Sequence, residues 1–211
     1  MGRVVVNNSL TLDGVMQAPA AADEDRRGGF AYGGWARPYF DSVMGELAGE
    51  GMANGGSMLF GRRTYQQFAS FWPSQPDSNP FAAVLNSRQK YVASRTLQEP
   101  LPWANSTLLM GDAADAVARL KADHDGDLVI LGSGELIGSL MRRNLIDQYT
   151  LLIHPLILGS GRRLFSDDSA YTSLELLSTT TSTTGVIIAT YQPTRPAHRA
   201  SRAVDQAGGG V

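Results

Sequence analysis

The sequence predicts an α/β fold in which a largely parallel sheet is covered by helices on both faces. Short apolar or β-branched runs alternate along the chain with segments of helical periodicity. Residues 127–142 show this alternation most clearly, because an apolar run, a Gly-Ser-Gly turn and a helical pattern follow one another. Near the C-terminus, two strand-like runs flank a Ser/Thr-rich turn and predict a hairpin at an edge of the sheet. We therefore expect a mixed, mainly parallel sheet with a C-terminal antiparallel hairpin.

The first strand is predicted over residues 3–8, where three consecutive valines indicate burial on both faces. The Asp13-Gly14 pair then predicts a turn. Residues 17–37 form a long irregular segment, which aromatic side chains interrupt. These aromatics are Phe30, Tyr32 and Trp35. They favour a lid-like loop that packs over a site, rather than a solvated linker.

The remaining elements follow from periodicity, helix caps and glycine or proline positions. Helices are predicted over 38–52, from 61–65 onward, over 112–123 with Asp112 as N-cap, and after the turn at 132–134. Strands are predicted at 57–60, 90–94, 106–110, 128–132, 148–154, 174–178 and 186–192. Residues 72–80, with three prolines, are predicted to be a loop.

Composition limits the classes of function. The 211 residues are most simply one domain over 1–193, followed by a mobile tail at 194–211. A net charge of −2 does not indicate binding to nucleic acid or to an anionic membrane. No apolar run approaches the roughly 20 residues that span a bilayer, which favours a cytoplasmic protein. The chain has no cysteine and its three histidines show no ligand spacing, so no metal site is predicted.

Three predicted strand–helix junctions carry residues suited to phosphate binding. They are Gly61-Arg62-Arg63-Thr64, Ser94-Arg95-Thr96 and Gly132-Ser133-Gly134. Ligands of open α/β sheets bind outside the carboxyl ends of the strands, so the three junctions should converge. A helix N-terminus with a glycine turn suits a pyrophosphate, and arginines suit the additional 2′-phosphate of NADP. The alternative is that these arginines are solvated surface charges.

Several segments in order along the chain resemble one known family. They are Ser9–Gly14, Leu59–Tyr65, Lys90–Leu97, Val129–Leu131 with its glycine turn, Asn144–Asp147 and Pro155–Phe165. Together, over residues 3–193, they resemble the dihydrofolate reductase-like superfamily, in particular the branch that contains the C-terminal reductase domain of bacterial riboflavin biosynthesis. The resemblance implies a three-layer α/β/α domain, NADPH as cofactor and a homodimer.

The resemblance also implies a set of cofactor-binding residues. Gly61, Arg62, Arg63 and Thr64 match a pyrophosphate and 2′-phosphate turn, and Ser94, Arg95 and Thr96 match the adenosine side. Gly132, Ser133, Gly134, Glu135, Leu136 and Ile137 match the glycine turn, and Asp13 with Gly14 matches the start of the loop over the nicotinamide. The chain departs from the family at Ser133, where a second adjacent glycine is usual, and in its insertion at 17–37.

Candidates for the chemistry itself are Trp35 and Asp41, which resemble a Trp and Asp pair of folate reductases at a spacing one residue longer. Trp35 is a candidate wall for ring stacking, with core packing as the alternative. Asp41 is either a catalytic or substrate contact or a helix-start residue. A phosphorylated substrate would need a further cation, and one of the other arginines can supply it. These are Arg26, Arg27, Arg37 and Arg162.

The resemblance therefore implies an oxidoreductase that uses NADPH. It would transfer a hydride to a small pteridine- or pyrimidine-like heterocycle or its ribosylated form. A 5-amino-6-(5-phosphoribosylamino)uracil reductase is an enzyme of this kind. The alternative is an NADPH-binding module or sensor with little catalysis. An NAD-linked Rossmann dehydrogenase is disfavoured because no G-x-G-x-x-G turn follows the first strand.

Overall fold

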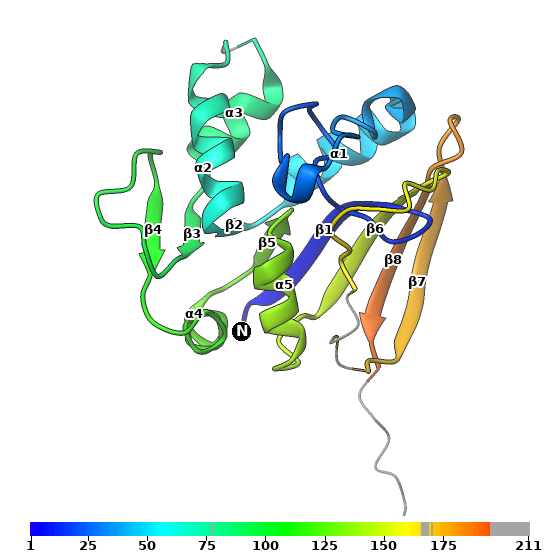
Figure 1. The fold of residues 1–211 in the computed structure, drawn as a ribbon. Helices are drawn as coiled ribbons and strands as arrows, with labels where there is room; N and C mark the ends of the chain where they lie inside the picture. The colour runs from blue at the N-terminus through cyan, green and yellow to red at the C-terminus, as the bar shows by residue number, and fades with distance from the viewer. Residues whose placement is uncertain (77, 166–168, 170, 195–211) are drawn as a thin grey trace, which may run out of the picture.

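A computed structural model describes residues 1–76, 78–165, 169 and 171–194 (Figure 1). It contains an eight-stranded sheet in the order β4-β3-β2-β5-β1-β6-β8-β7. The strands are β1 (Arg3–Thr11), β2 (Ser57–Gly61), β3 (Lys90–Ala93), β4 (Ser106–Leu109), β5 (Asp127–Leu131), β6 (Gln148–His154), β7 (Leu174–Thr181) and β8 (Ile187–Pro193). Strands β1 to β6 are mutually parallel, whereas β8 is antiparallel to both of its neighbours, β6 and β7. The predicted mixed sheet with an antiparallel hairpin at its edge is confirmed.

Helices cover both faces of the sheet. They are α1 (Ser42–Asn54), α2 (Arg62–Phe71), α3 (Pro80–Ser87), α4 (Ala113–Asp123) and α5 (Gly134–Met141). The largest apolar cluster joins one face of the sheet to α4 and α5, which lie in front of it in Figure 1. Two other clusters join the opposite face to α1, α2 and α3. Strand β2 shows the alternation directly, since Leu59 packs in the first cluster while Met58 and Phe60 pack in another. The three-layer α/β/α architecture is confirmed.

Two helices differ from the sequence prediction. Helix α1 begins at Ser42 rather than at residue 38, because Asp41 is its N-cap and accepts a hydrogen bond from the Met44 N–H at 3.0 Å. Pro38 instead lies in a short 3₁₀ turn at 37–39. Helix α3 was not predicted, although Asn79 caps it and Pro80 occupies its first turn.

Strand β1 is longer than predicted, because it pairs with β6 up to Thr11. Strand β7 extends beyond the predicted 174–178 to Thr181, whereas β8 starts and ends one residue later than the predicted 186–192. Asp112 caps α4 as predicted, accepting from the N–H groups of Ala114 and Asp115. The tail predicted at 194–211 lies, after Thr194, outside the described residues. Within the part of the chain that is described, no helix has the length and apolar character needed to cross a membrane.

Lys90 is fully buried at the start of β3, at the end of the strand opposite the predicted site. Its Nζ donates to the carbonyl oxygens of Asn86, Arg88 and Ala104 at 3.2, 2.7 and 3.0 Å. It also lies 4.3 Å from the centroid of the Trp103 ring. Burial lowers the pKa of the Lys90 ammonium to about 8. The carbonyl groups thus hold a cation that desolvation disfavours.

We expect the wild type to gain stability relative to Lys90→Met as pH rises from 7.5 to 10. Below about pH 8 the lysine is protonated in both states, whereas above it the unfolded chain binds the additional proton, so rising pH favours folding. The expected gain is about 2 kcal/mol, less than the full shift implies because the carbonyls stabilise the charge. Urea unfolding of both proteins at the two pH values measures it. Parallel pH dependence of the two would contradict the prediction.

Candidate functional site

The carboxyl edge of the parallel strands brings the predicted cofactor segments together. Along this edge β3, β2, β5 and β1 are neighbours in that order. Ser94–Thr96 follows β3, Gly61–Thr64 spans the end of β2, the 132–135 turn follows β5, and Asp13-Gly14 follows β1. With strands about 4.8 Å apart, the four segments form a row about 14 Å long. Motifs far apart in sequence thus form one continuous surface.

The turns after β2 and β5 are locked to each other by hydrogen bonds. The Gly61 N–H donates to Ser133 Oγ, and the Ser133 N–H donates to Thr64 Oγ1, both at 3.0 Å. Asn8, buried in β1, fixes the same turn from the other side. Its Oδ1 accepts from the Gly132 N–H at 2.7 Å, and its Nδ2 donates to the Gly132 carbonyl at 3.2 Å. The sequence analysis missed Asn8, although a polar amide within a buried valine-rich strand is a usable signal.

Backbone conformation explains which residues the β5–α5 turn accepts. Gly132 and Ser133 have φ values of 59° and 56°, in the left-handed region. A Cβ on Gly132 would lie 3.1 and 3.2 Å from side-chain atoms of Thr64, so the positive φ and this tight contact both favour glycine there. A serine in this region costs about 1 kcal/mol, which its hydrogen bonds to Gly61 and Thr64 offset. Serine thus replaces the usual second glycine without opening the turn.

The two helices that begin at this site lack side-chain caps. Helices α1, α3 and α4 are capped by Asp41, Asn79 and Asp112. In contrast, α2 and α5, whose N-caps are Gly61 and Ser133, have no side-chain cap hydrogen bond. Their first backbone N–H groups therefore have no intrahelical partner. Two such N-termini side by side fit a diphosphate, which accepts from several amides and gains from both helix dipoles.

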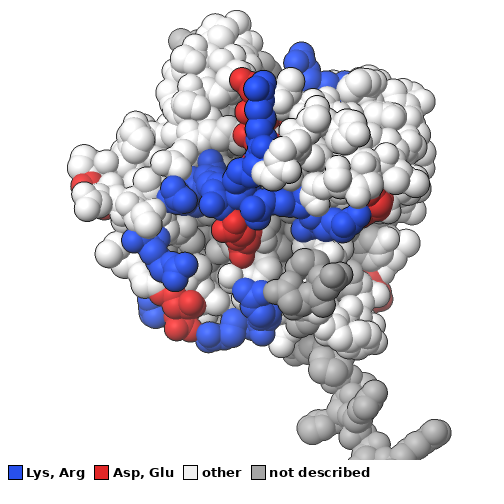
Figure 2. All heavy atoms as spheres, viewed as in Figure 1, with Lys and Arg blue, Asp and Glu red and all other residues white. Residues whose placement is uncertain are grey.

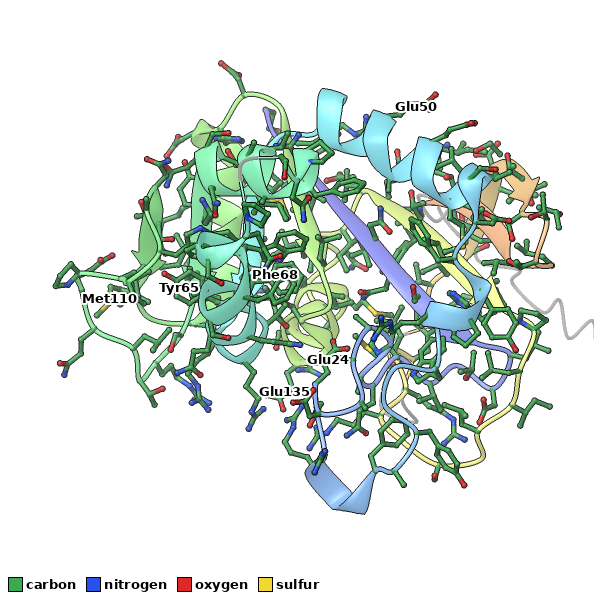
Figure 3. The ribbon with its side chains drawn as sticks, turned by 90° about the horizontal axis from the view of Figure 1, so that it is seen from above. Glu24, Glu50, Tyr65, Phe68, Met110 and Glu135 are labelled. Carbon is green, nitrogen blue, oxygen red and sulfur yellow. The ribbon has the colours of Figure 1, made fainter. Side chains whose placement is uncertain are left out.

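Glu135, in the first turn of α5, is the centre of a cluster of arginines. Its Oε1 lies 2.6 Å from Arg63 Nη1, 3.4 Å from Arg162 Nη1 and 3.6 Å from Arg27 Nη1. Figure 2 shows basic side chains gathered around an acidic one on this face. In Figure 3, Glu135 lies at the start of α5 beside the segment 17–37. We call Arg27, Arg63, Arg162 and Glu135 the arginine cluster.

The other predicted cofactor residues divide into free and engaged groups. Within the described part of the chain, the side chains of Arg62 and Arg95 make no hydrogen bond or ion pair, so both guanidinium groups are available to a ligand. Ser94 Oγ accepts from the N–H groups of Thr96 and Leu97 and so shapes the loop after β3. The side chains of Leu136 and Ile137 are buried in the core. Only backbone atoms of these two residues can face a ligand.

Asp13 connects the end of β1 to the loop after β6. Its carboxylate accepts from the N–H groups of Leu158 and Gly159 at 3.2 and 2.9 Å, and from Thr11 Oγ1. The Thr11 hydroxyl first, together with these amides, lowers the pKa of Asp13. Gly14 follows with a φ of 79°. The geometry therefore gives Asp13 a role in loop position, and any cofactor contact of the pair stays a prediction.

Trp35 is buried within the segment 17–37. Its Nε1 donates to the Gln17 carbonyl at 2.7 Å, and its ring contacts the His154 ring edge-on with centroids 5.1 Å apart. Phe30 belongs to the same apolar cluster, and the partly buried side chains of Leu156 and Leu158 pack against it. The segment thus has its own small core, and Trp35 packs in it. His154 is fully buried, as expected of a core histidine.

Asp41 occupies the helix-start position that the sequence analysis left open. Besides Met44, its carboxylate accepts from the N–H and hydroxyl of Thr183, both at 2.6 Å, and from the Thr184 N–H at 3.3 Å. These bonds, with the Thr183 side chain first, lower the pKa of Asp41 to about 2. At neutral pH the group has no proton to give. Its visible role is to tie α1 to the β7–β8 turn.

Fold and site together define a class: a three-layer α/β/α protein in which two helices without side-chain caps begin at the carboxyl edge of a mixed sheet. Residues 3–188 match the model of the RibD C-terminal domain family. The chain belongs to this family, and the resemblance inferred from the sequence is confirmed.

Two relatives from Bacillus subtilis (strain 168) are the uncharacterized proteins YyaP and YwjB. The chain is 29% identical to YyaP over 64% of this chain and 72% of that one, and 26% identical to YwjB over 58% and 66%. Its fold resembles a putative riboflavin biosynthesis protein from Shewanella sp. PV-4, with a TM-score of 0.66, 22% identity and 92% and 99% of the two chains covered. It also resembles a pyrimidine reductase-like protein from Corynebacterium diphtheriae, with a TM-score of 0.59, 13% identity and 92% of each chain covered. The RibD protein of Acinetobacter baumannii has a TM-score of 0.58 and 15% identity, and this chain covers only 58% of it.

Proposed function

We propose that the protein is an NADPH-dependent reductase that transfers a hydride to a pyrimidine- or pteridine-like heterocycle or its ribosylated form. The observation that carries the proposal is the pair of uncapped helix starts, α2 and α5, joined by the bonds of Ser133 to Gly61 and Thr64. Membership of the RibD C-terminal domain family supports it, as does the likeness to proteins named for riboflavin biosynthesis and pyrimidine reduction.

In this proposal the cofactor lies along the row of strand ends from β3 to β1. The amides that begin α2 and α5 hold the pyrophosphate, while Arg62 and Arg95 hold the 2′-phosphate. The bound nicotinamide supplies the hydride, and the protein orients the two rings and excludes water. We propose that the segment 17–37, with Trp35 in its core, covers the nicotinamide end. This division of roles needs no metal.

Cofactor binding and turnover test the proposal separately. Thermal unfolding with NADPH and with NADH should give a larger rise in the melting temperature with NADPH. NADPH oxidation, followed by loss of nicotinamide absorbance, should then occur with a dihydropteridine or a ribosylaminopyrimidinone as acceptor. Equal stabilisation by the two cofactors would contradict the roles of Arg62 and Arg95. Tight NADPH binding without NADPH oxidation in the presence of either acceptor class would contradict the proposed reductase activity.

A second candidate is an NADPH-binding module or sensor with little catalysis. One observation favours it: Asp13, Asp25 and Asp41, which lie around the lid and the site, all have lowered pKa values. Hydrogen bonds to Thr11, Arg27 and Thr183, respectively, are the largest causes. All three carboxyl groups are therefore ionised at neutral pH, and none can act as the proton donor. A reductase would take its proton from water or from the substrate.

We also retain a homodimer and a cytoplasmic location as proposals. The edge strand β7 supports the first, because almost all of its residues are exposed, among them Leu176 and Leu177. An exposed edge strand with apolar side chains is a surface that another chain can pair with.

A further inference from the structure

A buried histidine connects the segment 17–37 to the sheet. His154 is the last residue of β6, where it pairs with Thr11 of β1 at the carboxyl edge. Its side chain is fully buried. The imidazole meets the rings of Trp35 and Tyr39 edge-on, with centroids 5.1 and 5.6 Å away and interplanar angles of 90° and 81°. The proposed cofactor positions give this imidazole no role.

Hydrogen bonds assign the proton of the neutral imidazole. The Nδ1 atom of His154 lies 3.0 Å from the Leu152 carbonyl oxygen and 3.3 Å from that of Leu10. A carbonyl oxygen can only accept, so Nδ1 carries the hydrogen and Nε2 carries the lone pair. The Nε2 atom is buried and has no hydrogen-bond partner among the described residues. Protonation would therefore place a charged N–H where no acceptor is available.

The surroundings of His154 also offer no counter-charge within the described residues. Strands β1 and β6 contribute backbone carbonyl groups, the segment 17–37 contributes the uncharged Trp35, and Tyr39 has the only ionisable side chain among these contacts. Two carboxylates belong to the neighbouring elements, Asp13 after β1 and Asp41 before α1. Backbone N–H groups and hydroxyl groups already bind both of them. Burial accordingly lowers the pKa of His154, and its two carbonyl hydrogen bonds oppose this shift only in part.

Trp35 connects His154 to the rest of the lid-like segment. Its Nε1 donates to the Gln17 carbonyl oxygen at 2.7 Å. The buried Gln17 side chain in turn donates to the carbonyl oxygens of Asp25 and Arg27 at 3.1 and 3.0 Å. The ring contact with His154 is thus continuous with the contacts that fold the segment on itself.

We propose that His154 is a pH-sensitive latch: the neutral imidazole holds the segment 17–37 closed against the sheet, and protonation releases it. In the closed state a charged imidazole lacks an acceptor and a counter-charge, whereas in the released state water solvates it. The closed state therefore binds fewer protons than the released state, and falling pH favours release. As a pH-dependent closure, the latch is independent of the proposed function; as a control over the nicotinamide end, it rests on that function.

Hydrogen exchange of two amides in the segment measures the release without any ligand. The N–H groups of Gly34 and Ala36 donate to the carbonyl oxygens of Ala18 and Pro19 at 2.8 and 3.0 Å. A released imidazole titrates at its ordinary pKa of about 6.5. Between pH 7.5 and 5.5, the protection factors of the two amides, corrected for the intrinsic pH dependence of exchange, should therefore fall about tenfold. The amides of β5, in the middle of the sheet, should keep theirs.

Two variants remove the titrating group. His154→Asn keeps an N–H donor near the position of Nδ1, and His154→Phe keeps a ring; neither side chain takes up a proton. In both, the protection factors should change less than about twofold between the two pH values. His124→Asn is the matched control, because His124 also meets a tyrosine edge-on, Tyr91 near the start of β3, with centroids 5.8 Å apart. Its pH response should equal that of the wild type.

Three results would overturn the latch: no pH dependence of the Gly34 and Ala36 amides in the wild type, an equal fall in the His154 variants, or an equal fall in β5. The last would mean that acid unfolds the whole domain. If neither variant folds, NMR titration of the wild-type imidazole decides, since a His154 pKa at or above about 6.5 contradicts release by protonation. No cofactor takes part in these measurements, so failure of the proposed reductase activity would leave their result standing.

Discussion

Gly56→Ala is expected to lower the free energy of unfolding by about 4 kcal/mol, a large part of the 5–15 kcal/mol typical of a folded protein. A Cβ on Gly56 would lie 1.9 Å from the Asp127 carbonyl oxygen and 2.7 Å from its carbon. Both are backbone atoms, so no side-chain rotation relieves the overlap. Strands β2 and β5 pair from Ser57 and Leu128 onward, in the middle of the sheet. The two strands would have to separate where their hydrogen bonds begin.

The same change should weaken the site, because β2 and β5 end at the turns that Gly61 and Ser133 join. Gly49→Ala is the matched control. Gly49 lies inside α1, nothing lies within 4 Å of a Cβ built there, and alanine should add about 0.5–1 kcal/mol of stability. Urea unfolding monitored by circular dichroism compares the two variants. A Gly56→Ala protein within about 1 kcal/mol of the wild type would refute the close approach of the two strands.

Local patterns were sufficient to predict most of the fold. The valine run of β1, the Asp112 cap and the glycine turn at 132–134 each act over a few residues, so their sequence signals are direct. Where two local signals competed, the sequence reading erred. Pro38 suggested a helix start, but the capping carboxylate of Asp41 sets the actual one. The cap formed by Asn79 and Pro80 was overlooked because three prolines indicated a loop.

The site could be predicted only in part, because its main contacts join residues far apart in sequence. The three predicted junctions converge because parallel strands share one carboxyl edge, which is a rule of topology. No such rule places Asn8 against Gly132, or Arg27 and Arg162 against Glu135. These contacts depend on the course of the long loops, for which the sequence carries no periodic signal. The sequence named both arginines as candidate cations and could not choose between them and others.

The double variant Arg62→Ala/Arg95→Ala is expected to weaken NADPH binding about a hundredfold or more, while NADH affinity stays within about threefold. Both guanidinium groups lack partners within the described residues, so no internal ion pair is broken by their removal. Each should lose one charge-assisted contact to the 2′-phosphate, worth about 1.5–2 kcal/mol. NADH lacks this phosphate, so removing the two arginines reduces only the general electrostatic attraction between NADH and the site. Fluorescence titration of the reduced nicotinamide measures both affinities.

Arg63 provides the contrast that makes this test specific to position. It follows Arg62 directly, yet its guanidinium is held by Glu135 at 2.6 Å. Arg63→Ala should therefore change the preference for NADPH over NADH much less than Arg62→Ala, although both remove one positive charge from the first turn of α2. If the two single variants lose NADPH affinity equally, the effect is one of net charge at the helix start. If only Arg63→Ala loses it, the cofactor phosphate displaces Glu135 and the assignment of Arg62 is wrong. A loss confined to Arg62→Ala and Arg95→Ala would identify the 2′-phosphate position from binding data alone.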